Sequence, residues 1–471
     1  MAVFGFISLS LRAAGVDDRL VQLAAASAAL AALAGAWYLR HALTQRLALM
    51  LDRMARVPSI RWWLACTALG LALRLGWVLA VDSQPSSDGA TYLGLARGLL
   101  AGHGYSAGGT LAYWPPGYPL FLLPWLEVLE SDRVAVVVSN LVLFVITMLG
   151  VRALARQTGD AGVERLALLL LALWPNLIAQ IVTPEKEQLL VALFPWVLCT
   201  AMAAIGAGRL PSAAAWAVVC GLVLGAANLV QPAFVLFPVA LVTFWALTTR
   251  RIWHALTLGL ALVVGAGSII APWSLRNLRV LDQFVLISTN GGVGLYGANN
   301  PRAGGGYYEH WAEDDLTRMD ELSADREGRR RALAWIQRHP GDALRLAFEK
   351  NLRFMGDDAA GVFQSLKRGG GTDNPVTYGA TKLFANAFWL GFWCLALAAL
   401  LVPRRRDDRM NTVHLLVSAA FLYGFALHSV AESAGKYHVY ATAALCVLLP
   451  LTVQLAALRA PTQFDQGGFH E

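Results

Sequence analysis

Charged residues are scarce in this sequence. Only 15% of its 471 residues are Asp, Glu, Lys or Arg, whereas 57% are hydrophobic. Soluble globular domains contain roughly 25% charged and about 45–50% apolar residues, so this composition excludes a water-soluble fold of this length. Apolar runs of about 18 or more residues recur along most of the chain, which predicts an all-α polytopic membrane protein. The short alternating segments that a transmembrane β-barrel needs are missing.

Cysteine is also sparse, and no residues have the spacing of metal ligands. All five cysteines fall inside apolar runs: Cys66, Cys199, Cys220, Cys394 and Cys446. We therefore expect no disulfide framework, no metal site and no cofactor, with a divalent metal ion left open. The chain lacks a cleavable signal sequence, so its first apolar run, which starts near Leu20, is expected to stay in the mature protein. No internal repeat is present, which disfavours a transporter.

The apolar runs predict about eleven transmembrane helices. Their approximate bounds are 20–39, 62–81, 133–155, 164–181, 186–206, 212–230, 233–249, 253–271, 381–402, 411–430 and 437–458. The residues between the first two spans carry Arg40, Arg46, Arg53, Arg56 and Arg61, which the positive-inside rule places in the cytoplasm. By alternation the other short basic connectors fall on the same side: Arg152, Arg156 and Arg165, then Arg209, then Arg250 and Arg251, then Arg404, Arg405 and Arg406. We expect the amino terminus outside and the carboxyl terminus inside.

This topology divides the chain into four parts. Residues 1–61 hold an extra span and a cytoplasmic connector, and residues 62–271 form a transmembrane core with an outer loop at 82–132. Residues 272–380 form an outer domain, and residues 381–471 hold the last spans. In the outer parts we expect an interfacial apolar stretch up to about Leu129, a glycine-rich loop from Gly291 to Gly306, and two amphipathic helices from about Ser323 to Met355, broken near Pro340.

An isolated acid opens the first outer loop. Asp88 follows a bilayer-length apolar run, and Tyr92, four residues later, would lie on the same side of a short helix. Asp88 is either the cap of that helix or a general base, because a partly desolvated carboxylate can accept a proton from an attacking hydroxyl. We favour the base. Asp82 competes with it but lies at the end of a span.

Two further outer segments combine a structural and a chemical interpretation. Thr183, Pro184 and Glu185 form an ordinary helix start, but Lys186 places a cation where the helix dipole opposes it, which favours a bound anion. Arg276 and Asn277 follow Pro272 and Trp273. They are either an interfacial anchor or a clamp on phosphate, for which Arg supplies a forked donor.

The last outer turn is rich in reactive groups. Glu432, Lys436, Tyr437 and His438 lie between two very apolar spans, so the turn is either solvated or part of a site. We favour a site, because an acid, a cation, a phenol and an imidazole rarely gather in such a turn by chance.

Two patterns that suggest nucleotides or nucleic acids are rejected. Gly292, Gly294 and Gly297 match GxGxxG, but no βαβ strand precedes them and Pro301 interrupts any following helix. The cluster Arg329–Arg331 is typical of a solvated helix face, and the outer domain holds about as many acids as bases. The formal charge of +7 therefore reflects membrane orientation, and no nucleic-acid partner is expected.

Taken together, the outer motifs resemble a known family. Over nearly all of residues 62–458 the chain is similar to GT-C-type membrane glycosyltransferases, and most to the bacterial branch of the protein O-mannosyltransferase and aminoarabinose transferase superfamily. The resemblance is carried by Ser87-Asp88-x3-Tyr92, Gly102-His103-Gly104-Tyr105, Pro115-Pro116-Gly117-Tyr118-Pro119, Trp174-Pro175, Thr183-Pro184-Glu185, Pro272-Trp273-Ser274-Leu275-Arg276-Asn277, Gly297-Ala298-Asn299-Asn300-Pro301, His339-Pro340 and Lys436-Tyr437-His438. It departs from the family in its extra first span, and in Lys436, where the family more often has Arg.

The resemblance implies a site built from these motifs. Asp88 would be the loop aspartate at the reaction centre. We assign Asp88 and Glu185 to catalysis, and Lys186, Arg276 and Lys436 to the donor phosphate. The residues assigned to substrate binding are Tyr92, His103, Tyr105, Asn277, Glu432, Tyr437 and His438.

The resemblance also implies a reaction. We expect an inverting glycosyltransferase that moves a sugar from a polyprenyl-phosphate carrier to a glycan, lipid or protein acceptor at the outer face of the bacterial cytoplasmic (inner) membrane. Two rival functions are a carrier or flippase of lipid-linked sugars, and a polymerase or ligase of the O-antigen type. A flippase would need polar residues lining a path through the spans, whereas here they cluster at one face.

Overall fold

The structure is a computed structural model that describes residues 1–403 and 407–457. Within that part of the chain the secondary structure is helical, and the single β pairing is an isolated bridge between Ala107 and Thr110. The basic residues Arg404–Arg406, expected in an inward connector, lie outside the described residues.

The predicted set of transmembrane helices is confirmed. Among the described residues, ten helices are long and apolar enough to cross a membrane, and a pair bent by 46° raises the number to eleven. The ten are α2 (Asp18–Ala55), α3 (Ser59–Ala80), α6 (Asp132–Arg156), α9 (Glu187–Gly206), α10 (Leu210–Val230), α11 (Phe237–Thr249) with the preceding turn Pro232–Phe234, α12 (Ile252–Leu281), α17 (Pro375–Leu400), α18 (Asp408–Val430) and α19 (Thr442–Ala457) with the preceding turn Gly435–Ala441. The bent pair is α7 (Ala161–Leu173) with α8 (Pro175–Ala179) and the turn Gln180–Val182. The protein is a multi-pass, all-α membrane protein.

Two of these helices are longer than the sequence predicted. α2 runs on to Ala55 because the segment after its apolar part contains strong helix formers and no glycine or proline before Pro58. α12 continues through Pro272 to Leu281, so Arg276 and Asn277 lie on a helix and not at the start of a loop. An additional short helix, α1 (Ala2–Ala13), was not expected.

Shorter helices lie between the spans. The first outer segment contains α4 (Ser87–Leu100) and the apolar α5 (Gly117–Val128). The later segment contains α13 (Gly291–Ala298), α14 (Glu321–Arg338), α15 (Pro340–Gly356) and α16 (Ala360–Val362). The expected break near Pro340 is confirmed. The expectation of a glycine-rich loop from Gly291 is wrong for its first half: α13 packs against α14 so closely that a Cβ on Gly292 would lie 1.9 Å from the backbone oxygen of Asp325.

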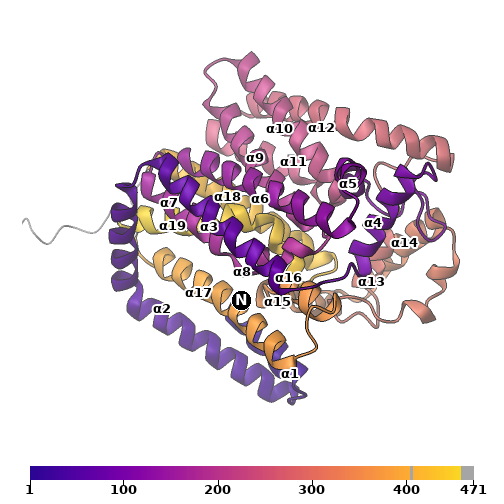
Figure 1. The fold of residues 1–471 in the computed structure, drawn as a ribbon, viewed down its shortest axis with the longest axis horizontal. Coiled ribbons are helices and arrows are strands. Elements are labelled where there is room, and N and C mark those ends of the chain that lie inside the picture. Colours follow the sequence, from indigo (N-terminus) through magenta and orange to yellow (C-terminus); the bar gives the residue numbers. More distant parts are fainter. Residues whose placement is uncertain (404–406, 458–471) are drawn as a thin grey trace, which may run out of the picture.

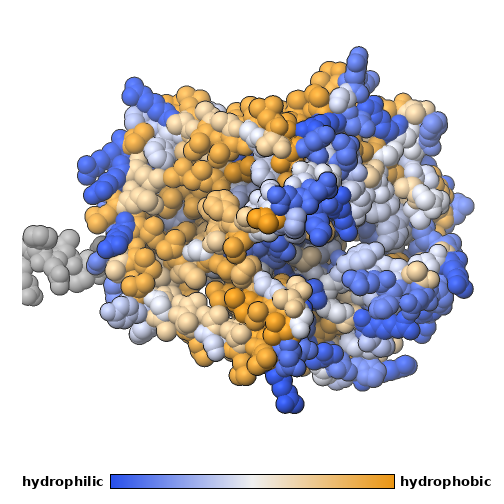
Figure 2. Space-filling view, turned by 60° about the horizontal axis from the view of Figure 1, so that its bottom comes forward, coloured by the Kyte–Doolittle hydropathy of each residue, from blue (hydrophilic) through white to orange (hydrophobic). Residues whose placement is uncertain are grey.

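Three of the connectors predicted to share one side of the membrane meet at one end of the bundle. Trp62 Nε1 donates to Arg165 O at 2.8 Å, and Arg165 Nη2 donates to Val57 O at 3.0 Å. Arg409 Nε donates to Gln157 O at 2.5 Å. The elements α4, α13 and α14, which lie in segments predicted to be outer, gather at the opposite end, to the right in Figure 1. In Figure 2 hydrophobic residues cover the broad middle of the visible face, and hydrophilic residues concentrate toward that same right-hand end.

A buried arginine lies at the break between α7 and α8. Arg74, 2% exposed on α3, donates through Nη1 to Gly70 O at 3.1 Å and to Ala172 O at 3.3 Å. Its guanidinium also lies 3.7 Å from the centre of the Phe144 ring. Ala172 is in the last turn of α7, whose carbonyls have no partner within the helix, so the cation satisfies one of them and suits the helix dipole. This break turns the chain toward Glu185 and Lys186.

Candidate active site at the outer end

Asp88 lies in the first turn of α4, directly after a strained residue. Ser87 has φ 52°, in the left-handed region that costs a non-glycine residue about 1–2 kcal/mol. The helix cap is Ser86, with no side-chain capping bond, so Asp88 is not the cap. Its carboxylate is left to face the neighbouring elements, as the general-base interpretation requires.

The carboxylate of Asp88 pairs with Lys436. Lys436 Nζ lies 3.0 Å from Asp88 Oδ2, although the two residues are 348 positions apart in sequence. Their side chains are 24% and 30% exposed, so the pair is partly shielded from water. Burial alone would raise the pKa of Asp88, but Lys436, Lys186 and Arg368 together outweigh it and hold that pKa below its usual value.

Two glycines allow the elements that carry this pair to approach their neighbours. A Cβ on Gly89 would lie 2.8 Å from Pro184 Cγ, so the start of α4 packs directly against the segment before α9. A Cβ on Gly435 would lie 2.0 Å from Asp357 O, so the turn with Lys436 rests on the chain after α15. Both contacts need a residue without a side chain, and together they bring Asp88, Glu185 and Lys436 into one cluster.

Glu185 and Lys186 extend the same cluster. Glu185 is 4% exposed, and burial, reinforced by the charge of Glu187, raises its pKa to about 8. Lys186 immediately precedes α9 and experiences the charges of Glu187, Lys436 and Asp88. Lys186, which the sequence analysis singled out because its charge opposes the helix dipole, therefore lies among carboxylates and near a second lysine.

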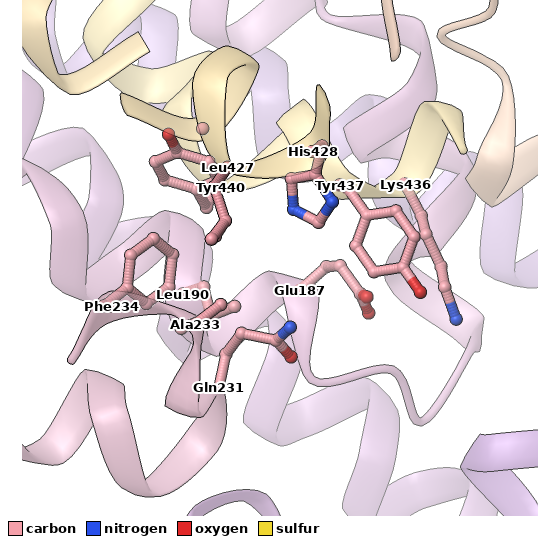
Figure 3. Close-up of a pocket in the computed structure, with 11 residues that line it drawn as sticks. Glu187, Leu190, Gln231, Ala233, Phe234, Leu427, His428, Lys436, Tyr437 and Tyr440 are labelled. Atoms are coloured by element: carbon pink, nitrogen blue, oxygen red, sulfur yellow. The ribbon is translucent and has the colours of Figure 1, made fainter. Parts of the chain in front are cut away.

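A narrow pocket opens beside Lys436 (Figure 3). About 350 Å³ of empty space lies inside and in front of it, open solvent included. Its polar lining residues are Glu187, Gln231, His428, Lys436 and Tyr437, and its apolar ones are Leu190, Ala233, Phe234, Gly424, Leu427 and Tyr440. In Figure 3 the carboxylate of Glu187 and the amide of Gln231 project into the space that the lining residues enclose.

The last outer turn supplies a further part of this lining. Tyr437 Oη donates to Glu432 Oε1 at 3.1 Å, and its ring stacks on His428 at 4.4 Å between centroids. His428 Nδ1 lies 2.6 Å from the backbone oxygen of Glu432. Tyr437 therefore lines the pocket together with Lys436, and Glu432 holds the Tyr437 hydroxyl in place.

His438 points away from this pocket, into a buried polar network. It is fully buried, with Nδ1 2.6 Å from Phe354 O and Nε2 3.1 Å from Asp358 Oδ1, and its ring stacks on Trp389 at 4.4 Å. Asp358 also accepts from Trp174 Nε1 at 2.7 Å and from Asn176 Nδ2 at 2.6 Å. His438 thus fastens the turn to the core, and its neighbour Lys436 faces the pocket.

Four other predicted site residues are engaged elsewhere. Arg276 donates to Leu111 O at 2.6 Å and to Tyr105 O at 3.1 Å. Asn277 Nδ2 donates to Val285 O and Ile287 O, both at 3.1 Å. Tyr105 Oη lies 3.0 Å from the backbone oxygens of Trp114 and Pro115, and His103 is exposed after α4. Arg276 and Tyr105 hold the outer loop against the end of α12, whereas Asn277 holds the chain that follows α12.

Tyr92 is the aromatic support beneath the site. It is 1% exposed and packs edge-on against Trp114 at 5.6 Å and Tyr118 at 5.5 Å. Burial, with the nearby charges of Asp88 and Glu187, raises its pKa well above the ordinary value. The phenol therefore stays neutral and fixes the orientation of α4.

Several site residues escaped the sequence analysis. Glu187, Gln231, His428 and Arg368 lie in or near the cluster, and Asp358 holds its supporting turn. Glu187 carried the one usable signal, as an acid inside an apolar run directly after Lys186. Within residues 1–403 and 407–457 no group of three or more His, Cys, Asp or Glu is arranged to hold a metal ion.

The fold is known from solved structures. No family model and no curated protein matches the sequence. The chain matches the apo crystal structure of the oligosaccharyltransferase from Archaeoglobus fulgidus with a TM-score of 0.51 and 14% identity, over 84% of this chain and 50% of that one. It therefore spans about half the length of the oligosaccharyltransferase. It also matches ArnT from Cupriavidus metallidurans bound to undecaprenyl phosphate, with a TM-score of 0.43 and 15% identity, over 85% of this chain and 77% of that one. At these identities the likeness shows the fold alone, and that fold is the GT-C architecture of membrane glycosyltransferases.

Proposed function

We propose that the protein is an inverting glycosyltransferase that moves a sugar from a polyprenyl-phosphate carrier to a hydroxyl or amine of a glycan, lipid or protein. The observation that carries the proposal is the convergence of Asp88, Glu185, Lys186 and Lys436, from three separate segments, in one charged cluster beside the pocket that Lys436 lines. The GT-C fold provides a setting for such chemistry, but the argument rests on the site.

The two lysines suit the leaving group. When the bond between the anomeric carbon and the phosphate oxygen breaks, charge develops on a phosphate monoester, and fixed cations in a partly dry site stabilise it. Lys436 and Lys186 are both close enough to Asp88 for their charges to lower its pKa. Arg276, whose guanidinium donates to the backbone of Leu111 and Tyr105, acts in this proposal by holding the outer loop.

Asp88 takes the proton of the acceptor. The acceptor oxygen attacks the anomeric carbon from the face opposite the phosphate, its proton passes to Asp88, and the configuration inverts. In the absence of the donor, Asp88 is paired with Lys436 and is a weak base. A donor phosphate that draws the ammonium of Lys436 toward itself removes this pairing, so the donor makes Asp88 more basic at the moment the base is needed.

The hydrophobic part of the donor fits beside α5. This helix is apolar and too short to span the bilayer, and Tyr118, Phe121 and Trp125 follow one another along it in aromatic contact. The positive-inside rule, applied to the basic connectors at the other end, supports a site outside the cytoplasm, with the amino terminus outside and the carboxyl terminus inside. No nucleotide sugar is available there, which favours a lipid-linked donor.

A release assay tests the proposal. Purified protein is incubated with a polyprenyl-phosphate sugar and candidate acceptors, and polyprenyl phosphate is measured. Acceptor-dependent release supports the transferase. Movement of the intact donor across liposomes without release indicates a flippase, and consumption of diphosphate-linked glycans alone indicates a polymerase or ligase.

A further inference from the structure

Glu187 is a buried acid that the proposed mechanism does not use. It is 4% exposed, lines the pocket, and its Oε2 has no hydrogen-bond partner among the residues that the structure describes. A buried carboxylate oxygen without a donor costs about 1–3 kcal/mol or more, so such an atom points to a missing partner.

Gln231 repeats the same feature across the pocket. It ends α10 and lines the same space, and its Oε1 is buried without a partner in the described part of the chain. In Figure 3 its amide faces the carboxylate of Glu187. Both unpartnered atoms are hydrogen-bond acceptors, so the group that completes them must present donors.

The walls around these two acceptors restrict the ligand further. Phe234, Tyr440 and Tyr437 surround the space with aromatic rings, which suit the C–H faces of a sugar ring. A phosphate cannot satisfy Glu187, because an anion lacks donors and repels the carboxylate. Phosphate is accommodated at Lys436 and Lys186 instead, which leaves Glu187 and Gln231 to the sugar.

We infer that Glu187 and Gln231 form the sugar-recognition edge of this pocket, and that the sugar is a neutral polyhydroxy sugar or a cationic amino sugar, not a uronic acid. The inference rests on the proposed function, which it deepens by naming the class of sugar. Hydroxyl or ammonium hydrogens donate to Glu187 Oε2 and Gln231 Oε1, whereas a sugar carboxylate would place a second negative charge beside Glu187.

Binding measurements on the full-length protein in detergent test this assignment. The probes are polyprenyl phosphate, its neutral hexose conjugate and its hexuronate conjugate. The unaltered protein is expected to bind the hexose conjugate at least tenfold more tightly than the hexuronate conjugate, because the hexuronate carboxylate is repelled by Glu187. Tenfold corresponds to about 1.4 kcal/mol. Glu187→Gln is expected to weaken hexose-conjugate binding about tenfold and to leave polyprenyl phosphate binding unchanged or tighter.

Two further variants keep the test decisive. Gln231→Met removes the second acceptor and is expected to weaken the hexose conjugate selectively, which covers the case in which Glu187→Gln does not fold. Glu309→Gln makes the same chemical change at an exposed position outside both the pocket and α5 and is expected to alter nothing. If Glu187→Gln and Gln231→Met change the affinities for polyprenyl phosphate and for its hexose conjugate equally, or change neither, the sugar assignment is wrong while the transferase proposal stands. If the unaltered protein binds none of the three probes, the proposed function itself fails.

Discussion

Asp88 and Lys436 are held together by elements that the sequence separates widely. Because each is the other's nearest opposite charge, neither is free in the protein without ligand. A substitution at one therefore changes the state of the other, and each must be tested with a readout specific to its own role.

For Asp88 the specific readout is turnover. Asp88→Asn keeps the shape of the side chain and removes the proton acceptor, so we expect transfer to fall by at least about 100-fold, the scale of general-base catalysis. Donor affinity should be kept or improved, since Lys436 loses its internal counter-ion. Size-exclusion behaviour and thermal unfolding provide the control for folding. Full turnover in this variant would remove Asp88 from the mechanism.

For the lysines the specific readout is donor affinity. Lys436→Met and Lys186→Ala are each expected to weaken polyprenyl phosphate binding about tenfold or more, the scale of a hydrogen bond to a charged group. Lys367→Met, at an exposed position, is the matched control. Unchanged affinity in Lys436→Met or Lys186→Ala would exclude that lysine from the phosphate site.

Glu185 makes donor binding depend on pH. Its pKa, raised to about 8 by burial and by the charge of Glu187, means that it is protonated at pH 7 and ionises as the pH rises through 8. Ionisation adds a negative charge beside the two lysines, so polyprenyl phosphate should bind roughly tenfold more weakly at pH 9 than at pH 7. Titrations across this range measure the effect.

Glu185→Gln cannot ionise and is expected to bind polyprenyl phosphate with the same affinity at both pH values. An equally steep pH dependence in Glu185→Gln would assign the titration to another group.

At the scale of elements, the spans were predictable and their ends were less so. Length and hydropathy are enough to find a helix that must cross a bilayer, because its backbone groups have to be satisfied within the segment. They do not reveal that α12 passes through Pro272 or that α13 forms from a glycine-rich segment. Both depend on neighbouring elements, as the close contact of Gly292 with α14 illustrates.

The turn Gly435–Ala441 shows a second limit of the sequence. It is a 3₁₀ helix, with about three residues per turn, so adjacent side chains point in directions about 120° apart. Lys436 faces Asp88, Tyr437 lines the pocket, and His438 enters the core. The motif predicted three site residues, but only the backbone conformation separates the two that line the pocket from the one that anchors the turn.

The network around Asp358 is expected to stabilise this turn. Asp358→Leu leaves the donors of Trp174, Asn176 and His438 without their acceptor, at about 1–3 kcal/mol for each unsatisfied group. We expect the free energy of unfolding to fall by about 3 kcal/mol or more, measured by denaturation in detergent. Asp373→Asn, an exposed acid, is the control and should change it little. A wild-type stability for Asp358→Leu would contradict the anchoring role.

At the scale of the whole molecule, the arrangement of polar ends predicts a topology. We expect a cysteine at His103 to react with a membrane-impermeant maleimide in intact cells, and a cysteine at Arg251 to react only after permeabilisation. Both positions are exposed, and they lie on opposite ends of the predicted alternation. The native cysteines lie inside spans, and the unaltered protein serves as the background. The reverse labelling pattern would place the site in the cytoplasm.

The sequence predicted the whole molecule better than its pocket. The span count is a sum over many residues, so single errors cancel. A pocket instead depends on a few side chains from distant segments: Gln231 looked like part of an ordinary outer turn, and Glu187 like part of a helix start. Only the fold brings these two unpartnered side chains into the lining of one pocket.

The contacts of Gly89 and Gly435 have a practical consequence. Each holds one half of the acid–lysine pair against a separate wall, with no room for even one carbon atom. A methyl group at Gly89 would displace the acid by a few tenths of an ångström. One at Gly435, whose Cβ would lie 2.0 Å from a backbone oxygen, would displace the lysine further, with the reacting groups themselves unchanged. The transfer rates of the two alanine variants would therefore measure how far the proton acceptor and the cation can move before the chemical step slows.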